Sequence, residues 1–263
     1  MKDGRQDEEP IVPGPEEMHE DRPPYAPASS LDPTQLRRAL SDLNLLGDDP
    51  FLRMQAFNLG MIDEWLTGLE QGLLEALVRQ DGTPLPEAAF LSAQSQMWLF
   101  AAYELMRTWR QRCRDMIKWS ESGGLERKLS ELERDLGYLH FAREVRASQI
   151  RSAIENPGRM EAIGQDLKRT YFLYAHLEAV RVSLAKHEVR RKRNAVAVQP
   201  GYGRINLWCG ALDYDVEDGV YSVGPINRRD IADGIRVLVE RHVPSDEDLA
   251  SFDAYMRGSI EGE

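Results

Sequence analysis

The sequence predicts a mainly α protein, an antiparallel bundle of long helices with a small antiparallel β-hairpin or three-stranded insert near the C-terminus. Two observations carry this prediction. Up to residue 193, apolar residues recur every three or four positions, which is the repeat of an amphipathic helix. Beyond residue 193 the pattern changes to short runs rich in β-branched and aromatic residues, which are typical of strands.

Capping residues and prolines mark the first two predicted helices. Asp32-Pro33 places a capping acid before a first-turn proline, which predicts a short helix to about Leu46. Asp49-Pro50 repeats this arrangement, so a second helix is expected over 51–80. Glycine and proline then break the chain at 81–86.

Three longer helices are expected next. The third covers about 87–120 and has one apolar stripe. A fourth is expected over 125–155, because its leucines alternate by four and three as in antiparallel bundle packing: Leu125, Leu129, Leu132, Leu136 and Leu139. The fifth runs over about 159–193. Long helices joined by short breaks pack as antiparallel neighbours.

The C-terminal region is predicted to hold the β insert. Strands are expected over 205–209, 211–216 and 220–223, and so small a sheet must pack on the bundle to be stable. A helix then begins at Pro225 or Asn227 and ends near His242. A capping box at 245–248 predicts a last short helix. We therefore divide the chain into a tail (1–31), a bundle (32–242) with an insert at 204–223, and an acidic C-terminal helix and tail (243–263).

The net charge of -11 is unevenly distributed along the 263 residues. Residues 1–32 hold nine acids and three bases, and residues 243–263 hold six acids and one base. The body between them is neutral, but its middle, residues 102–193, carries 20 bases and 13 acids. The sequence therefore does not exclude an anionic partner.

Residues 1–31 form an acidic, proline-rich segment with few apolar side chains, which predicts disorder. Two interpretations of this tail are open. It can serve only to keep the protein in solution, or it can fold back over the basic middle and compete with an anionic partner.

Several classes of protein are disfavoured by what the sequence lacks. No apolar run suits a membrane span, the N-terminus does not read as a signal peptide, and Cys113 and Cys209 are the only cysteines. A cytoplasmic location is expected. Spacings typical of metal ligands and nucleotide-binding loops are absent, so no cofactor and no metal site is predicted.

The most distinctive run is residues 186–194, at the end of the fifth predicted helix. It is rich in Lys and Arg. Cations at a helix C-terminus offset the helix dipole, and guanidinium groups also bind phosphate. Both interpretations are open. The second one predicts an anion-binding site made of Lys186, Arg190, Arg191, Lys192, Arg193 and Asn194.

Arginine and histidine recur at short spacing in the helical region. Arg181 and His187 form an Arg-x5-His pair, and Arg169 with His176 and Arg134 with His140 are similar pairs. Arg193-Asn194 begins a run of the form Arg-Asn-x3-His in which Val198 stands at the histidine position.

With these motifs, residues 87–198 resemble the HEPN superfamily of helical proteins. The resemblance implies a helical bundle that dimerises, and in many members a metal-independent endoribonuclease of toxin, defence or RNA-processing systems. Other members are not catalytic. It implies Arg181 and His187 as the catalytic pair, whereas the Val198 register implies loss of the catalytic histidine.

We therefore predict a HEPN-like binding or regulatory protein that contacts RNA or another anionic partner through the basic helix end. The alternative is a metal-independent endoribonuclease that uses Arg181 and His187, in which histidine moves a proton and arginine stabilises phosphate charge. The other interpretation of His187 is a core histidine that bonds to Glu188 or to a neighbouring helix. A homodimer or a partner protein is expected through the long helices, and no membrane.

Two smaller features also carry expectations. Glu104 and Arg107 are expected to form an ion pair at helical spacing. Arg228-Arg229-Asp230 opens a predicted helix, where bases oppose the helix dipole, so these arginines require a further reason to be there.

Overall fold

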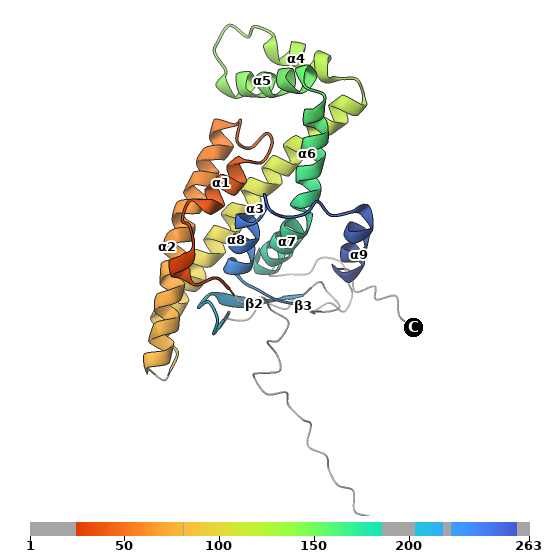
Figure 1. The fold of residues 1–263 in the computed structure, drawn as a ribbon. Coiled ribbons are helices and arrows are strands. Elements are labelled where there is room, and N and C mark those ends of the chain that lie inside the picture. The colour runs from red at the N-terminus through yellow and green to blue at the C-terminus, as the bar shows by residue number, and fades with distance from the viewer. Residues whose placement is uncertain (1–24, 81, 186–202, 218–221, 257–263) are drawn as a thin grey trace, which may run out of the picture.

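The computed structural model describes residues 25–80, 82–185, 203–217 and 222–256. This part of the chain is mainly α, as predicted, and forms a helical bundle with a three-stranded antiparallel sheet (Figure 1). Among the helices described, none has the length and apolar composition needed to cross a membrane.

Two long antiparallel helices form the centre of the bundle. They are α2 (Pro50–Gln80) and α3 (Leu85–Glu121), which agree with the predicted bounds to within two residues. Asp49 caps α2 as expected, because its carboxylate accepts hydrogen bonds from the backbone N–H groups of Phe51 and Leu52 at 2.9 and 3.1 Å. Short α1 (Gln35–Ser41) packs on α2 and ends earlier than predicted.

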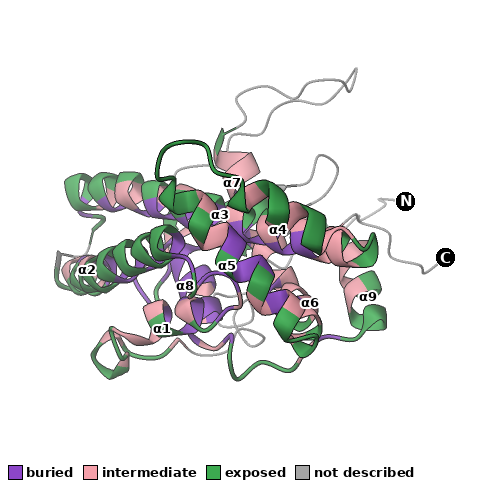
Figure 2. Ribbon diagram, turned by 90° about the horizontal axis from the view of Figure 1, so that it is seen from above, coloured by how far each residue is buried: buried purple, intermediate pink, exposed green. Residues whose placement is uncertain are grey.

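The apolar stripe of α3 is buried in the core from Leu91 to Met116 (Figure 2). Trp109 is fully buried, and its indole N–H donates to the carbonyl oxygen of Asn44 at 2.7 Å. The Trp98 indole N–H donates to the Leu59 carbonyl at 3.0 Å. Each large aromatic residue therefore adds apolar burial and also satisfies a backbone acceptor.

The prediction of one continuous fourth helix over 125–155 is wrong. The chain forms α4 (Leu125–Glu133) and α5 (Phe141–Glu155), with a loop between them. Leu136 and Leu139 of the predicted seam are exposed in this loop. Gly137 has a positive φ of 74° and donates its N–H to the Asp135 carboxylate at 2.7 Å, a local turn that competes with helix.

The expected fifth helix is also interrupted, between α6 (Gly158–Arg169) and α7 (Tyr171–Ala185). Buried Thr170 donates its hydroxyl to the carbonyl oxygen of Asp166 at 2.8 Å. Arg110 of α3 donates to the Leu167 carbonyl at 3.1 Å and to the Thr170 hydroxyl at 2.9 Å. The Asp166 carbonyl oxygen also accepts the helical bond from the Thr170 N–H at 3.0 Å, so the side-chain bonds add partners at the junction of α6 and α7. Residues 186–193 of the prediction lie outside the described residues.

The sheet has the order β1-β2-β3, with β1 (Arg204–Ile205), β2 (Leu212–Glu217) and β3 (Ser222–Ile226). Tyr214 of β2 pairs with Ile226 of β3, so the insert extends beyond the predicted limit of 223. The sheet packs on the bundle as expected, because Tyr214 and Val216 are buried in the common core and β2 contacts α7.

The last two helices, α8 (Arg228–Arg236) and α9 (Asp246–Met256), begin at predicted caps. Asn227 forms a capping box with Asp230. Ser245 and Asp248 form the predicted second box, with bonds of 2.8 and 3.1 Å. α8 ends well before His242, at which the sequence pattern placed its end.

The folded body begins before residue 31, at which the predicted N-terminal tail ends. The Tyr25 hydroxyl donates to the Asp230 carboxylate at 2.6 Å, and Arg229 donates to the carbonyl oxygen of Ala26 at 3.0 Å. Residues 28–30 form a short 3-10 helix. Residues 25–31 therefore belong to the folded body, because Asp230 and the buried Arg229 of α8 bond to them.

Candidate functional site

Arg181 is the member of the predicted site that lies within the described residues. It is half-buried near the end of α7, and its guanidinium carbon lies 5.1 Å from the ring centre of Tyr103 in α3. The Tyr103 ring stacks on that of Tyr174, with 5.7 Å between the ring centres. Arg181 thus lies on an aromatic platform, an arrangement that stabilises a guanidinium without neutralising its charge.

Glu178 is the acid at this platform. Both tyrosine hydroxyls donate to the same Glu178 oxygen, at 3.2 Å from Tyr103 and 3.3 Å from Tyr174. Burial, the bond with Tyr103 and the charge of Glu178 raise the pKa of Tyr174 well above its ordinary value. Within residues 25–80, 82–185 and the later described segments, no carboxylate forms an ion pair with Arg181.

The other predicted site residues lie outside the described residues. These are His187 and the anion-binding set Lys186, Arg190, Arg191, Lys192, Arg193 and Asn194. The spacing of Arg181 and His187 in the folded protein is therefore a prediction still. The predicted Glu104–Arg107 ion pair is present, with 2.7 Å between its charged atoms, at the exposed rim of α3.

The pair Arg169 and His176 is separated by the break between α6 and α7. Arg169 forms an ion pair with Asp166 at 2.7 Å. The ring centre of His176 lies 5.3 Å from that of Phe252 in α9, and burial lowers the pKa of this histidine. Each residue thus has its own structural partner.

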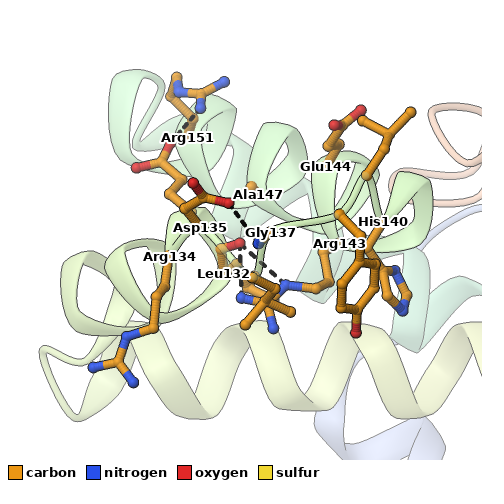
Figure 3. Close-up of a pocket in the computed structure, with 13 residues that line it drawn as sticks. Leu132, Arg134, Asp135, Gly137, His140, Arg143, Glu144, Ala147 and Arg151 are labelled. Atoms are coloured by element: carbon orange, nitrogen blue, oxygen red, sulfur yellow. Dashed lines mark hydrogen bonds and ion pairs between the residues drawn. The ribbon is translucent and has the colours of Figure 1, made fainter.

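The pair Arg134 and His140 spans the loop between α4 and α5, which lines a hollow of about 810 Å³. Arg134 points away from His140, from the far end of this loop (Figure 3). Arg143 holds the loop in place, since it donates to the carbonyl oxygens of Glu131 and Leu132 at the end of α4. Those carbonyls lack partners within the helix, so this contact is a C-terminal cap.

The described residues offer neither a group of metal ligands nor a cysteine that ionises readily. Among them, no group of three or more His, Cys, Asp or Glu side chains is arranged to hold a metal ion. Both cysteines are buried and free. Burial raises the pKa of the Cys209 thiol to about 12 and also raises that of Cys113, so neither thiol ionises readily.

A buried polar cluster between α8 and α2 was not predicted as a unit. The fully buried Arg228 of α8 donates to Asp63, to Glu70 and to the Thr67 hydroxyl, all on α2. Arg236 forms ion pairs with Asp63 and Asp233. Burial by itself lowers the pKa of Arg228, but the charges and hydrogen bonds of Glu70 and Asp63 outweigh burial and raise it.

This cluster joins α8 to α2, and it explains why Arg228 opens α8 against the helix dipole; the neighbouring Arg229 bonds instead to Asp233 and to the Ala26 carbonyl oxygen. Asp63, Thr67 and Glu70 recur at intervals of four and three on a face of α2 that is otherwise apolar. Such polar residues on a buried face are the sequence signal that could have located the cluster. Because these charges bond to one another, we assign the cluster to fold stability.

Asn227 connects the same end of α8 to the sheet. Its side-chain amide donates to Asp213 of β2 at 2.8 Å and to the Tyr25 hydroxyl at 2.9 Å. Asp215 forms an ion pair with Arg204 at 3.1 Å. Asp213 and Asp215 are therefore each bonded within the fold.

Comparison of the chain with models of protein families, with curated proteins and with solved structures finds no match.

Proposed function

We propose that the protein is a HEPN-like binding or regulatory protein that contacts RNA through the edge formed by α3 and α7 and by the basic run after α7. The observation that carries the proposal is the position of Arg181. Its guanidinium lies on the Tyr103 ring and forms no ion pair with a carboxylate of the described chain. Its positive charge is therefore available to a phosphate.

The sequence that follows extends this edge. Lys186 comes five residues after Arg181, and four more cations follow it up to Arg193. Basic side chains in such density bind the RNA backbone by charge and release counterions, so binding weakens steeply with salt. A binding role requires no catalytic histidine, which agrees with Val198 at the histidine position of the Arg-Asn-x3-His form.

The test is fluorescence anisotropy with a labelled single-stranded RNA. If about five phosphates are contacted, affinity falls roughly 100-fold between 50 and 200 mM salt. Replacing all five cations of the run by Gln should abolish most of the binding, and Arg181→Gln should weaken it several-fold. A matched control removes five exposed arginines elsewhere: Arg79, Arg114, Arg127, Arg134 and Arg204. Equal losses in both variants would reduce the proposal to nonspecific charge.

The second candidate is a metal-independent endoribonuclease with Arg181 and His187 as the catalytic pair. It rests on the same available guanidinium. RNA cleavage in EDTA that is lost in both Arg181→Gln and His187→Ala, with RNA binding retained in His187→Ala, would favour it. Binding without cleavage across several RNA substrates would favour the binding role.

A further inference from the structure

One face of α2 carries a continuous row of large apolar side chains at the surface. Its members recur at three and four residues, which is the spacing of a helix that packs on another helix. With two neighbours from α3, eight side chains of this kind are 41–64% exposed: Phe51, Met54, Phe57, Met61, Ile62, Trp65, Phe90 and Met97. We call these eight residues the α2–α3 face.

The two helices contribute to one surface. The ring of Trp65 in α2 lies edge-on to that of Phe90 in α3, with 5.9 Å between their centres. Ile62 and Met97 line the same hollow of about 370 Å³ between the helices. Exposed apolar surface of this extent, rich in Phe, Trp and Met, is typical of protein interfaces.

We propose that the α2–α3 face binds a second copy of this chain, with the two α2 helices antiparallel about a two-fold axis at Met61. The area is sufficient for a stable dimer. A large side chain buries about 200 Å², so half-exposure of eight corresponds to roughly 800 Å² per copy, the usual size for a specific interface.

The row is complementary to itself in shape. Its N-terminal half holds large side chains, whereas Gly68 and Gly72 lie on the same side in the C-terminal half, and a Cβ at either would meet open space. An antiparallel axis at Met61 places Met54 opposite Gly68 and Phe57 opposite Trp65. Met54 of one copy thus fills the open space beside Gly68 of the other, and the Phe57 and Trp65 rings meet on both sides of the axis, so the same patch is used twice, as a two-fold interface requires.

The charges at one flank are complementary in the same arrangement. Arg37 of α1 lies beside this row, with its guanidinium carbon 5.6 Å from the ring centre of Phe57. Glu64 is exposed on the same flank. The axis brings Glu64 of the other copy to the level of residue 58 along α2. Because Glu64 stays on the flank where Arg37 contacts Phe57, it lies next to Arg37. Two Arg37–Glu64 pairs would therefore form, one on each side of the axis.

The terminal segment 1–24 and the segment 186–202 of this chain are poorly suited by their sequences to cover the α2–α3 face. Residues 1–24 hold few large apolar side chains and are acidic, and residues 186–202 offer valines and one tyrosine. The face is also separate from the proposed RNA-binding edge. Met97 lines a hollow between α3 and α2, whereas Tyr103 contacts Tyr174 and Arg181 of α7. α2 and α7 lie on different sides of α3 (Figure 1). The two proposals can therefore fail independently.

The test is the mass of the full chain in solution, by light scattering after gel filtration and by sedimentation at 1–100 µM. Wild-type protein should have twice the chain mass of 30.0 kDa. Met61→Lys places like charges at the axis and should give the single-chain mass with unchanged circular dichroism. Val78→Lys is the control, since Val78 is 77% exposed on the same helix but points to another side.

A charge exchange tests the register and identifies the partner as a second copy. Arg37→Glu and Glu64→Arg should each weaken dimerisation about tenfold, and the double variant should recover most of this loss. A monomeric wild type at 100 µM, or a Met61→Lys variant that remains dimeric, would overturn the proposal. Failure of the double variant to recover would overturn the antiparallel register.

Discussion

Arg228 and Glu70 lie 158 positions apart in the sequence and form a two-point ion pair in the interior of the protein. The Arg228 Nε–H group donates to one Glu70 oxygen at 2.7 Å, and a terminal N–H group donates to the other. Neither side chain is exposed. The pair joins the first turn of α8 to the middle of α2, which places the sheet against the bundle.

Arg228→Met should lower the free energy of unfolding by about 3–5 kcal/mol, because Glu70 then stays buried without its cation. Arg79→Met is the matched control. It removes an exposed ion pair with Glu75 on the same helix and should cost less than about 1 kcal/mol. Urea unfolding followed by circular dichroism measures both. Equal costs would contradict the structural role of the Arg228 cluster.

Gly210 and Gly137 test the packing of the β1–β2 loop on α2. Both have positive φ, 76° and 74°, but a Cβ at Gly210 would lie 2.0 Å from the Glu70 carbonyl oxygen, whereas one at Gly137 meets open space. Gly137→Ala should cost only the backbone strain of about 1 kcal/mol. Gly210→Ala adds a clash with backbone and should cost about 3 kcal/mol. Similar melting temperatures for the two variants would argue against this loop position.

His176 should make the protein less stable in mild acid. Burial lowers its pKa in the folded state, so the unfolded chain binds the proton more readily. The contribution of His176 to the free energy of unfolding is therefore fully present above the ordinary pKa of about 6.5. It is lost as the pH falls through this value toward the lower pKa of the folded state. Asp230 opposes this shift and Arg241 adds to it.

The measurement is the free energy of unfolding at pH 7.5 and pH 5.5. His176→Gln should reduce the difference between the two values relative to wild type. Phe252→Leu is the control, since it removes the ring beside His176 but keeps the imidazole, and it should preserve most of the difference. An unchanged difference in His176→Gln would show that other groups cause the acid sensitivity.

Removal of residues 1–24 should tighten RNA binding if the acidic tail competes for the basic edge. This segment has eight acids and three bases. The deletion must stop at Pro24, because Tyr25 and Ala26 bond to α8. A several-fold gain in affinity is expected at 50 mM salt and little gain at 500 mM, where charges are screened. Replacing the eight acids by Asn and Gln should reproduce the gain, and no gain in either variant would leave the tail with a solubilising role.

The long helices could be predicted because their signals are local. A stripe of apolar residues fixes which side of α3 is buried, and Asp49, Asn227 and Ser245 cap helices through bonds to residues two or three positions away. The breaks within the fourth and fifth predicted helices could not be predicted in this way. At the break beside Thr170, the hydroxyl of this residue accepts a hydrogen bond from Arg110, which is 60 positions away.

The sequence by itself determined the mainly α class, the positions of most helix starts, the β insert and the uneven distribution of charge. Tertiary structure alone decided that Arg228 is buried with Asp63 and Glu70, that residues 25–31 join the folded body, and that a large apolar face of α2 and α3 is left at the surface. The physical reason is that helical periodicity shows which residues are apolar, whereas burial depends on which elements cover them. Only the packed arrangement shows that α1 and α3 pack on α2, that Arg228 of α8 bonds to it, and that one of its apolar sides is left uncovered.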